Sequence, residues 1–145
     1  YTLNSGPQRV RDFFANEAEQ LLKSRFAIVN VWRPIRGPVE ESPLALCDAQ
    51  SIAPADFVDT DLRYPHRTGE IQSVRFSPSH RWYYFPAMPA GAALLLKCFD
   101  SASDGRARFT AHTAFDDPTS PPDAAARESI ETRVFVFFAP EGQSR

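Results

Sequence analysis

Two stretches near the C-terminal end decide the interpretation: Arg-Phe-Thr-Ala-His-Thr-Ala-Phe-Asp-Asp at residues 108–117 and Ala-Arg-Glu-Ser-Ile-Glu-Thr-Arg-Val-Phe-Val-Phe-Phe at residues 126–138. Aromatic and β-branched residues favour strands, and a proline-rich loop separates the two. The first stretch carries His112, and a neutral imidazole binds transition metals. In the second, Arg127 and Ser129 share one face of a strand, where a guanidinium and a hydroxyl can hold a carboxylate.

A plainer interpretation fits the same residues. His112 would then be a single histidine on one strand, and the charged residues from Arg127 onward would form a solvated edge on the next strand. The two stretches by themselves leave both interpretations open, so the remainder of the chain has to separate them.

Length and composition exclude several classes of protein. The 145 residues suffice for a single domain with a core. The net charge of −2 and the scattered basic residues argue against a nucleic-acid partner. No apolar run is long enough to cross a membrane, and no signal peptide is visible. Cys47 and Cys98 lie in apolar runs and are expected to be free thiols, so we expect a cytoplasmic protein.

The spacing of apolar residues predicts a mainly β domain. Residues 7–23 start with a proline, follow helical spacing and predict one long helix near the N-terminus. Strands are predicted at 26–31, 44–47, 70–76, 81–85, 92–99 and in the two opening stretches, and the Asp-rich residues 53–69 are expected to be a solvated loop. Short strands with irregular loops indicate a sandwich or jelly roll.

Five blocks of sequence, taken together and in this order, resemble those of a known family. They are Ile-Val-Asn-Val-Trp-Arg-Pro-Ile at 28–35, Pro-Leu-Ala-Leu-Cys-Asp at 43–48, His-Arg-Trp-Tyr-Tyr-Phe-Pro at 80–86, His-Thr-Ala-Phe at 112–115 and Arg-Glu-Ser-Ile-Glu-Thr-Arg at 127–133. Together they resemble the AsaB-like hydroxylase/desaturase family, which includes CmcJ-like and gibberellin desaturase-like enzymes. The resemblance extends from Tyr1 to about Phe138.

The resemblance implies a fold and an activity. The fold is a double-stranded β-helix, a jelly roll of the cupin-like kind. The activity is that of a non-haem iron(II), 2-oxoglutarate-dependent dioxygenase, an oxidoreductase that hydroxylates or desaturates a small-molecule natural product in secondary metabolism. Residues 1–145 would form the C-terminal portion of such a domain.

The resemblance also implies a metal site of two histidines and one carboxylate, which bind one face of an iron ion. His112 is the expected ligand in this chain, and His80 is the second choice. In the family a His-x-Asp motif leads into a Tyr-Thr pair, which Tyr1 and Thr2 match. The other two ligands are therefore expected in a preceding segment of the same protein.

Cosubstrate and substrate residues follow from the same resemblance. Arg127 is expected to bind the distal carboxylate of 2-oxoglutarate, with Ser129 as a second hydrogen-bond donor. Arg133 lies on the same face of the strand and is the alternative, and Arg33 is a third candidate for an anionic group.

Two aromatic residues, Trp82 and Tyr84, are expected in the wall of the substrate pocket.

Two alternative functions remain open. One is a non-catalytic jelly-roll module that binds a ligand. The other is a cupin-type metalloenzyme that uses a three-histidine set of His66, His80 and His112.

Overall fold

Two antiparallel sheets and a hairpin form the framework of the chain in the computed structural model, which describes residues 1–139. The first sheet has the strand order β6-β1-β8, the second has the order β5-β2-β7, and β3 pairs with β4. The strands are β1 (Phe26–Pro34), β2 (Leu44–Cys47), β3 (Phe57–Tyr64), β4 (Arg67–Val74), β5 (Trp82–Tyr84), β6 (Leu94–Asp100), β7 (His112–Ala114) and β8 (Ser129–Phe137). This confirms the prediction of a mainly β domain.

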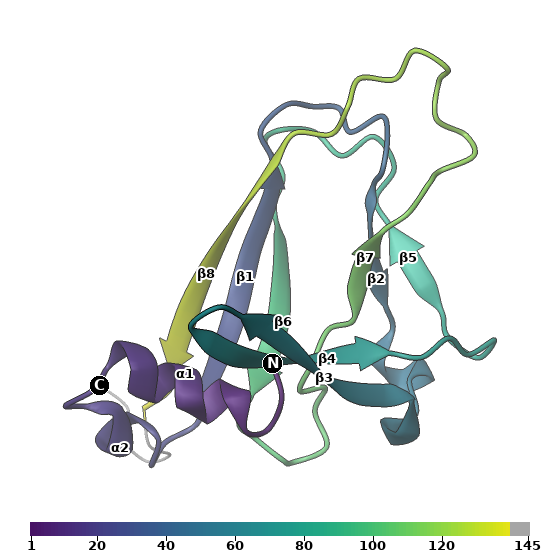
Figure 1. Ribbon diagram of the computed structural model, residues 1–145. Helices are drawn as coiled ribbons and strands as arrows, with labels where there is room; N and C mark the ends of the chain where they lie inside the picture. The colour runs from purple at the N-terminus through teal and green to yellow at the C-terminus, as the bar shows by residue number, and fades with distance from the viewer. Residues whose placement is uncertain (140–145) are drawn as a thin grey trace.

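Figure 1 shows the two sheets standing side by side, with the hairpin β3–β4 crossing at their lower end. The helices α1 (Ser5–Phe13) and α2 (Ala18–Leu21) lie at the lower end of β8 and β1. Two short 3-10 turns, η1 (Ala49–Ser51) and η2 (Pro54–Asp56), lead from β2 to the hairpin. No helix among the described residues is long and apolar enough to cross a membrane.

The prediction of one long helix over residues 7–23 is wrong. Helix α1 ends at Phe13, and Phe14 leaves the helical conformation with φ −122° and ψ 30°. The break allows the ring of Phe14 to contact both Phe135 and Phe137 edge-on, at centroid distances of 5.3 Å each. Such ring pairs stabilise packing beyond the area that they bury. The apolar spacing that predicted one helix therefore belongs to two short helices whose apolar residues join one core cluster.

The prediction of a solvated loop over residues 53–69 is also wrong. These residues form η2, all of β3 and the start of β4, in a regular register from Phe57↔Val74 to Tyr64↔Arg67. Most of the hairpin is exposed or half-buried, so its strands carry polar side chains and lack the apolar alternation of a core strand. Cross-strand hydrogen bonds such as that from Thr60 Oγ1 to Ser73 Oγ, at 3.1 Å, support the pairing instead.

The inward face of the first sheet positions the candidate site. Along β1 it carries Phe26, Ile28, Asn30 and Trp32, all of them buried. Phe26 and Ile28 belong to a helix-side cluster, whose buried members are Val10, Ala18, Phe26, Ile28 and Phe99. Trp32 belongs to a sheet-side cluster, whose buried members are Trp32, Val39, Met88 and Leu96, with Leu44 and Leu46 of β2 packed against them. Asn30 is the polar residue between these two apolar clusters.

Candidate active site

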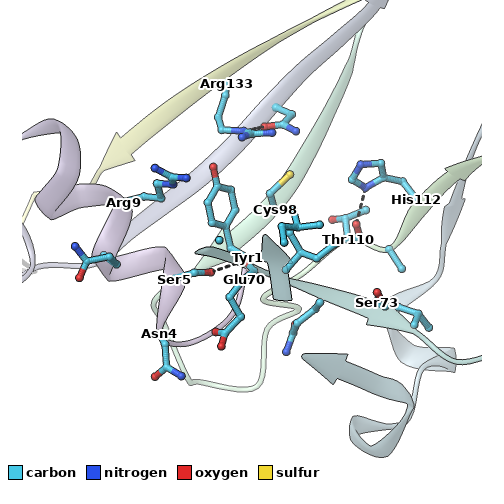
Figure 2. Close-up of a pocket in the computed structure, with 18 of the residues that line it drawn as sticks. Tyr1, Asn4, Ser5, Arg9, Glu70, Ser73, Cys98, Thr110, His112 and Arg133 are labelled. Carbon is cyan, nitrogen blue, oxygen red and sulfur yellow. Dashed lines mark hydrogen bonds between the residues drawn. The ribbon is translucent and has the colours of Figure 1, made fainter. Parts of the chain in front are cut away.

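A cavity of about 1060 Å³ lies where the two sheets, α1 and the hairpin meet. Its walls come from α1, β1, β3, β4, β5, β6, β7 and β8. Figure 2 shows Tyr1 and Cys98 near its centre, with Arg133 above them and His112 to the right. A volume of this size is at the upper end for small-molecule sites, so it can hold a cosubstrate together with a substrate.

His112 opens β7 and lines this cavity. Its Nδ1 is 2.8 Å from the carbonyl oxygen of Thr110, the contact drawn as a dashed line in Figure 2. A carbonyl oxygen only accepts hydrogen bonds, so Nδ1 must carry the proton that it donates. In the neutral ring Nε2 then keeps its lone pair. Carbonyl-anchored imidazoles of this kind are typical metal ligands.

Arg133 brings a positive charge to the opposite wall of the same cavity. Its Nε donates a hydrogen bond to Asn30 Oδ1 at 3.0 Å, and its Nη2 lies 3.4 Å from Glu131 Oε1. The guanidinium carbon is 5.3 Å from the centre of the Tyr1 ring, within range of a cation–π contact. These contacts fix the side chain while about half of it stays exposed, so it remains accessible to an anionic ligand.

Cys98 lies at an irregularity in the pairing of β6 with β1. The register passes from Ile28↔Phe99 to Val29↔Lys97, which leaves Cys98 without a directly opposed residue. A β-bulge of this kind redirects side chains and is common beside active sites. Burial raises the pKa of the Cys98 thiol, although the charge of Arg133 works in the other direction. The thiol is therefore a neutral part of the cavity wall, and both cysteines are free, as predicted.

The other predicted anion-binding residues do not line this cavity. Arg127 precedes β8, donates a hydrogen bond to the Ser42 carbonyl oxygen, and lies 5.7 Å from the Trp32 ring centre. Ser129 is opposite Pro34, at the far end of the β1–β8 pair from the helices. Arg33 is exposed and opposite Ile130. Of the predicted cationic residues, the structure brings Arg133 into the cavity of His112.

His80 has a different environment from His112. Its ring is almost fully buried, and its Nε2 is 2.9 Å from Asp56 Oδ2. This hydrogen bond lowers the pKa of the Asp56 carboxyl. The Asp56 carbonyl oxygen also accepts a hydrogen bond from the Arg75 backbone N–H. His80 therefore fastens the base of the hairpin and does not line the cavity.

The three histidines do not form one cluster. His66 is exposed in the turn between β3 and β4, and His80 is at the base of the same hairpin. Within residues 1–139 no group of three or more His, Cys, Asp and Glu side chains could hold a metal ion. The three-histidine alternative is therefore not supported by the geometry.

The two predicted pocket aromatics are separated. Trp82 lines the cavity with its side chain partly exposed. Tyr84 does not line it; its ring packs edge-on against Phe115 at 5.0 Å. A hydrogen bond with the Asp117 carboxylate raises the pKa of the Tyr84 hydroxyl.

Two residues of the cavity lining, Asn30 and Gln72, were not predicted from the sequence. Asn30 interrupts an otherwise apolar strand face, and this interruption could have identified it as a candidate.

A family model described as an oxidoreductase/YMDC permease-like domain matches residues 1–137. The chain belongs to this family. The sequence is 44% identical over 138 residues to the hydroxylase/desaturase AsaB of Aspergillus flavus, covering 86% of this chain and 60% of that protein. The aspirochlorine biosynthesis protein N of Aspergillus oryzae is 42% identical, with 90% of this chain and 56% of that protein covered. The resemblance seen in the sequence is thus confirmed.

Some relatives of this chain carry names that state a dependence on iron and 2-oxoglutarate. One is the Fe(II)/2-oxoglutarate-dependent dioxygenase NvfI of Aspergillus novofumigatus, 39% identical over 123 residues, with 83% of this chain and 44% of that protein covered. A solved structure, the iron and alpha-ketoglutarate-dependent endoperoxidase NvfI, superposes with a TM-score of 0.87 and 32% identity. The match covers 94% of this chain and 51% of that one, and it supports the jelly-roll class of fold. The chain spans roughly half the length of these relatives.

The residues of the cavity fit part of an iron and 2-oxoglutarate site. His112 has one imidazole nitrogen in the correct state to coordinate a metal, because Thr110 holds the proton on the other nitrogen. Arg133 can form charge-assisted hydrogen bonds to a carboxylate. Among the described residues, the cavity thus offers one imidazole nitrogen that could bind a metal and one guanidinium that could bind an anionic cosubstrate.

Proposed function

We propose that this chain contributes one iron ligand and the cosubstrate-binding arginine to a non-haem iron(II), 2-oxoglutarate-dependent oxygenase. Its substrate would be a small-molecule natural product, which it hydroxylates or desaturates. The observation that carries this proposal is that His112, with an available Nε2, and Arg133 line the same cavity. The cofactors named for the relatives and the NvfI structure support it.

Each residue has a defined part in the proposed reaction. Iron(II) with 2-oxoglutarate, when bound, supplies the oxidising chemistry that attacks an unactivated C–H bond. His112 coordinates the metal through Nε2, while the Thr110 carbonyl keeps the ring in one tautomer and orientation. Arg133 binds the distal carboxylate and is itself oriented by Asn30. Trp82 and the hairpin limit how the substrate and water approach.

The remaining iron ligands are proposed to come from a preceding segment of the same protein. Tyr1 lines the cavity, and Figure 2 shows its ring below Arg133 and beside Cys98. A residue joined to the amino group of Tyr1 would therefore be attached at the cavity itself. This placement supports the His-x-Asp ligands that the resemblance implies just before the Tyr1-Thr2 pair.

Turnover of 2-oxoglutarate tests the proposal. The protein that carries this chain, together with any segment that precedes it, is incubated with iron(II), oxygen and 2-oxoglutarate, and succinate is measured by mass spectrometry. We expect iron-dependent succinate formation that falls at least 100-fold in His112→Ala. Succinate formation that is absent from the parent protein would favour the non-catalytic binding module instead.

The roles of Arg127, which precedes β8, and Arg133, which lies in it, can be separated by affinity for 2-oxoglutarate. Loss of hydrogen bonds to a charged group costs about 1.5–3 kcal/mol, so Arg133→Gln should raise the dissociation constant for 2-oxoglutarate about 10- to 150-fold. Arg127→Gln is the matched comparison, because Arg127 contacts Ser42 and Trp32 outside the cavity lining. If Arg127→Gln weakens binding and Arg133→Gln does not, the role passes to Arg127 and Ser129.

A further inference from the structure

A second arginine, Arg9, lines the cavity from the side of α1. Its side chain is 24% exposed, so its guanidinium can be reached by a ligand. The residues of α1 and its N-cap that line the cavity are all polar: Asn4, Ser5, Gln8, Arg9 and Asp12. Residues three and four apart lie on the same face of a helix. The helix therefore turns a polar stripe towards the cavity, while its buried Val10 belongs to the helix-side cluster.

Arg9 is oriented by its neighbours and still has donors to spare. Its Nη1 donates a hydrogen bond to Asp12 Oδ2 at 2.9 Å, and the Oδ1 of the same carboxylate accepts one from Gln8 Nε2, also at 2.9 Å. Within residues 1–139, the Nε and Nη2 of Arg9 have no hydrogen-bond partner. A guanidinium carries five N–H donors and no acceptor, so most of the donors of Arg9 are available to an acceptor on a ligand.

Two further donor groups lie at the same end of the cavity. Figure 2 shows the guanidinium of Arg9 beside the hydroxyl end of the Tyr1 ring and that of Arg133 above it. The guanidinium carbon of Arg133 is 5.3 Å from the centre of this ring. The Tyr1 hydroxyl has no hydrogen-bond partner among the described residues. Two guanidinium groups and a free hydroxyl suit an anion with planar acceptors, of which a carboxylate is the common example.

Other parts of the cavity lining are apolar. Leu62 of β3, Ile71 and Val74 of β4, and Trp82 of β5 all line it. Small-molecule sites typically combine such apolar walls with a few polar groups that fix the orientation of the ligand. A ligand that fills this cavity would therefore place an apolar body against the hairpin and Trp82, and an acid group at Arg9.

We propose that Arg9 binds a carboxylate group of the substrate, so that the chain selects apolar molecules that carry an acid group. The word substrate, and the assignment of Arg133 to 2-oxoglutarate, rest on the proposed function, whereas the carboxylate site at Arg9 does not. Asp12 offsets part of the charge of Arg9. The selection therefore depends on the forked hydrogen bonds that a guanidinium gives to a carboxylate.

A pair of probes that differ in charge tests this assignment. The probe 1-adamantanecarboxylate carries an acid group on a rigid apolar cage, and 1-adamantanecarboxamide keeps the cage and a carbonyl oxygen but has no charge. Their affinities for the protein that carries this chain are measured by NMR titration at pH 7, without iron or 2-oxoglutarate. We expect the carboxylate to bind about 10-fold more tightly than the amide, at the lower end of the range for hydrogen bonds to a charged group.

Two variants on the same helix complete the test. Arg9→Gln should lower the affinity for the carboxylate about 10-fold and leave that for the amide nearly unchanged, so the two affinities become similar. Arg11→Gln removes the same charge from α1, but Arg11 pairs with Glu19 outside the cavity lining, so this variant should keep the parent ratio. The NMR spectra also report whether each variant keeps the fold.

Three results would overturn the proposal. They are equal affinities for the two probes in the parent protein, no detectable binding of the carboxylate, and equal losses of carboxylate affinity in Arg9→Gln and Arg11→Gln. Because the titrations contain no iron or 2-oxoglutarate, they are independent of turnover. Absence of iron binding or of succinate formation would count against the proposed function and not against the carboxylate site.

Discussion

The Nε of Arg133 on β8 donates a hydrogen bond to Oδ1 of Asn30 on β1 across 3.0 Å, and the two residues face each other in the strand register. Asn30 is almost fully buried, between the helix-side and sheet-side clusters. A buried amide in an apolar strand face lowers stability unless it is paired. The pair therefore satisfies Asn30 and at the same time holds a guanidinium at the wall of the cavity.

Replacing Asn30 tests whether it orients Arg133. Asn30→Leu is expected to lower the free energy of unfolding by only about 1 kcal/mol, because the half-exposed Arg133 remains hydrated. Affinity for 2-oxoglutarate should fall about fivefold, as for one lost hydrogen bond. Urea denaturation and calorimetric titration measure the two effects. Asn16→Leu, at an exposed position, is the control. Unchanged affinity in a folded Asn30→Leu protein would show that the orientation of Arg133 does not depend on Asn30.

Gly6 tests the packing of α1 on the first sheet. A Cβ at this position would lie 2.8 Å from ring atoms of Phe99, whose side chain is buried. Alanine favours a helix over glycine by about 1 kcal/mol, but overpacking of a core costs about 1–3 kcal/mol. We expect Gly6→Ala to destabilise the chain in urea unfolding. Gly91→Ala is the control, since no atom lies within 4 Å of the added Cβ. Equal stability of the two variants would contradict this packing.

The buried carboxyl of Asp100 should make stability depend on acid pH. Burial raises its pKa, but hydrogen bonds from Arg25, the Ala102 N–H and Lys97 outweigh that effect, so the net pKa is well below its ordinary value. A pKa that is lower in the folded state gives a stabilisation that is complete above about pH 4, the unfolded value, and is lost as the pH falls below it.

Comparison with an amide variant measures this contribution. Asp100→Asn is expected to be less stable than the parent by about 2 kcal/mol at pH 7, the scale of hydrogen bonds to a charged group. The difference should shrink as the pH is lowered from 4 towards 2. Asp61→Asn, which alters an exposed pair with Arg63, should change stability little at any pH. A difference between Asp100→Asn and the parent that is independent of pH would be inconsistent with the low pKa.

His80 should matter for stability and not for the metal. Its ring is buried and hydrogen-bonded to Asp56 at the base of the hairpin. Truncation of a buried ring costs about 2–4 kcal/mol, so His80→Ala should lower the urea midpoint clearly. His112→Ala removes a half-buried side chain and should lower it much less. A smaller effect of His80→Ala than of His112→Ala on the urea midpoint would contradict the structural role of His80.

The core strands could be predicted from the sequence because buried strands appear in it as short runs of apolar residues. β2 begins and ends where it was predicted, at Leu44 and Cys47, and β6 coincides with the apolar run around Leu96. The hairpin β3–β4 was predicted only in part, as a strand at residues 70–76, whereas β3 was predicted to be loop. The strand β3 carries polar residues such as the exposed Asp59 and the half-buried Thr60, and such residues resemble those of a loop.

The residue types of the candidate site, a histidine and an arginine, could be predicted from the sequence, but not which arginine lies in the cavity. Period-2 spacing predicted that Arg127 and Arg133 share one face of the last strand, but it could not say which of them lies in the same cavity as His112. The answer follows from the register, which sets Arg133 opposite Asn30 in the middle of β1 and Ser129 opposite Pro34 at its end. The position of Gln72 in the cavity lining could not be foreseen, because it depends on how the hairpin packs against α1.

The most direct test of the central claim is the iron content of the protein that carries this chain. Parent, His112→Ala and His80→Ala proteins are equilibrated with iron(II) without oxygen and in the presence of 2-oxoglutarate, and bound iron per chain is measured after dialysis. We predict about one iron in the parent and in folded His80→Ala. In His112→Ala we predict a loss of more than 10-fold in affinity, because loss of a residue that merely supports a metal ligand already costs about 10- to 100-fold. Unchanged iron binding in His112→Ala would contradict the assignment of His112 as the ligand.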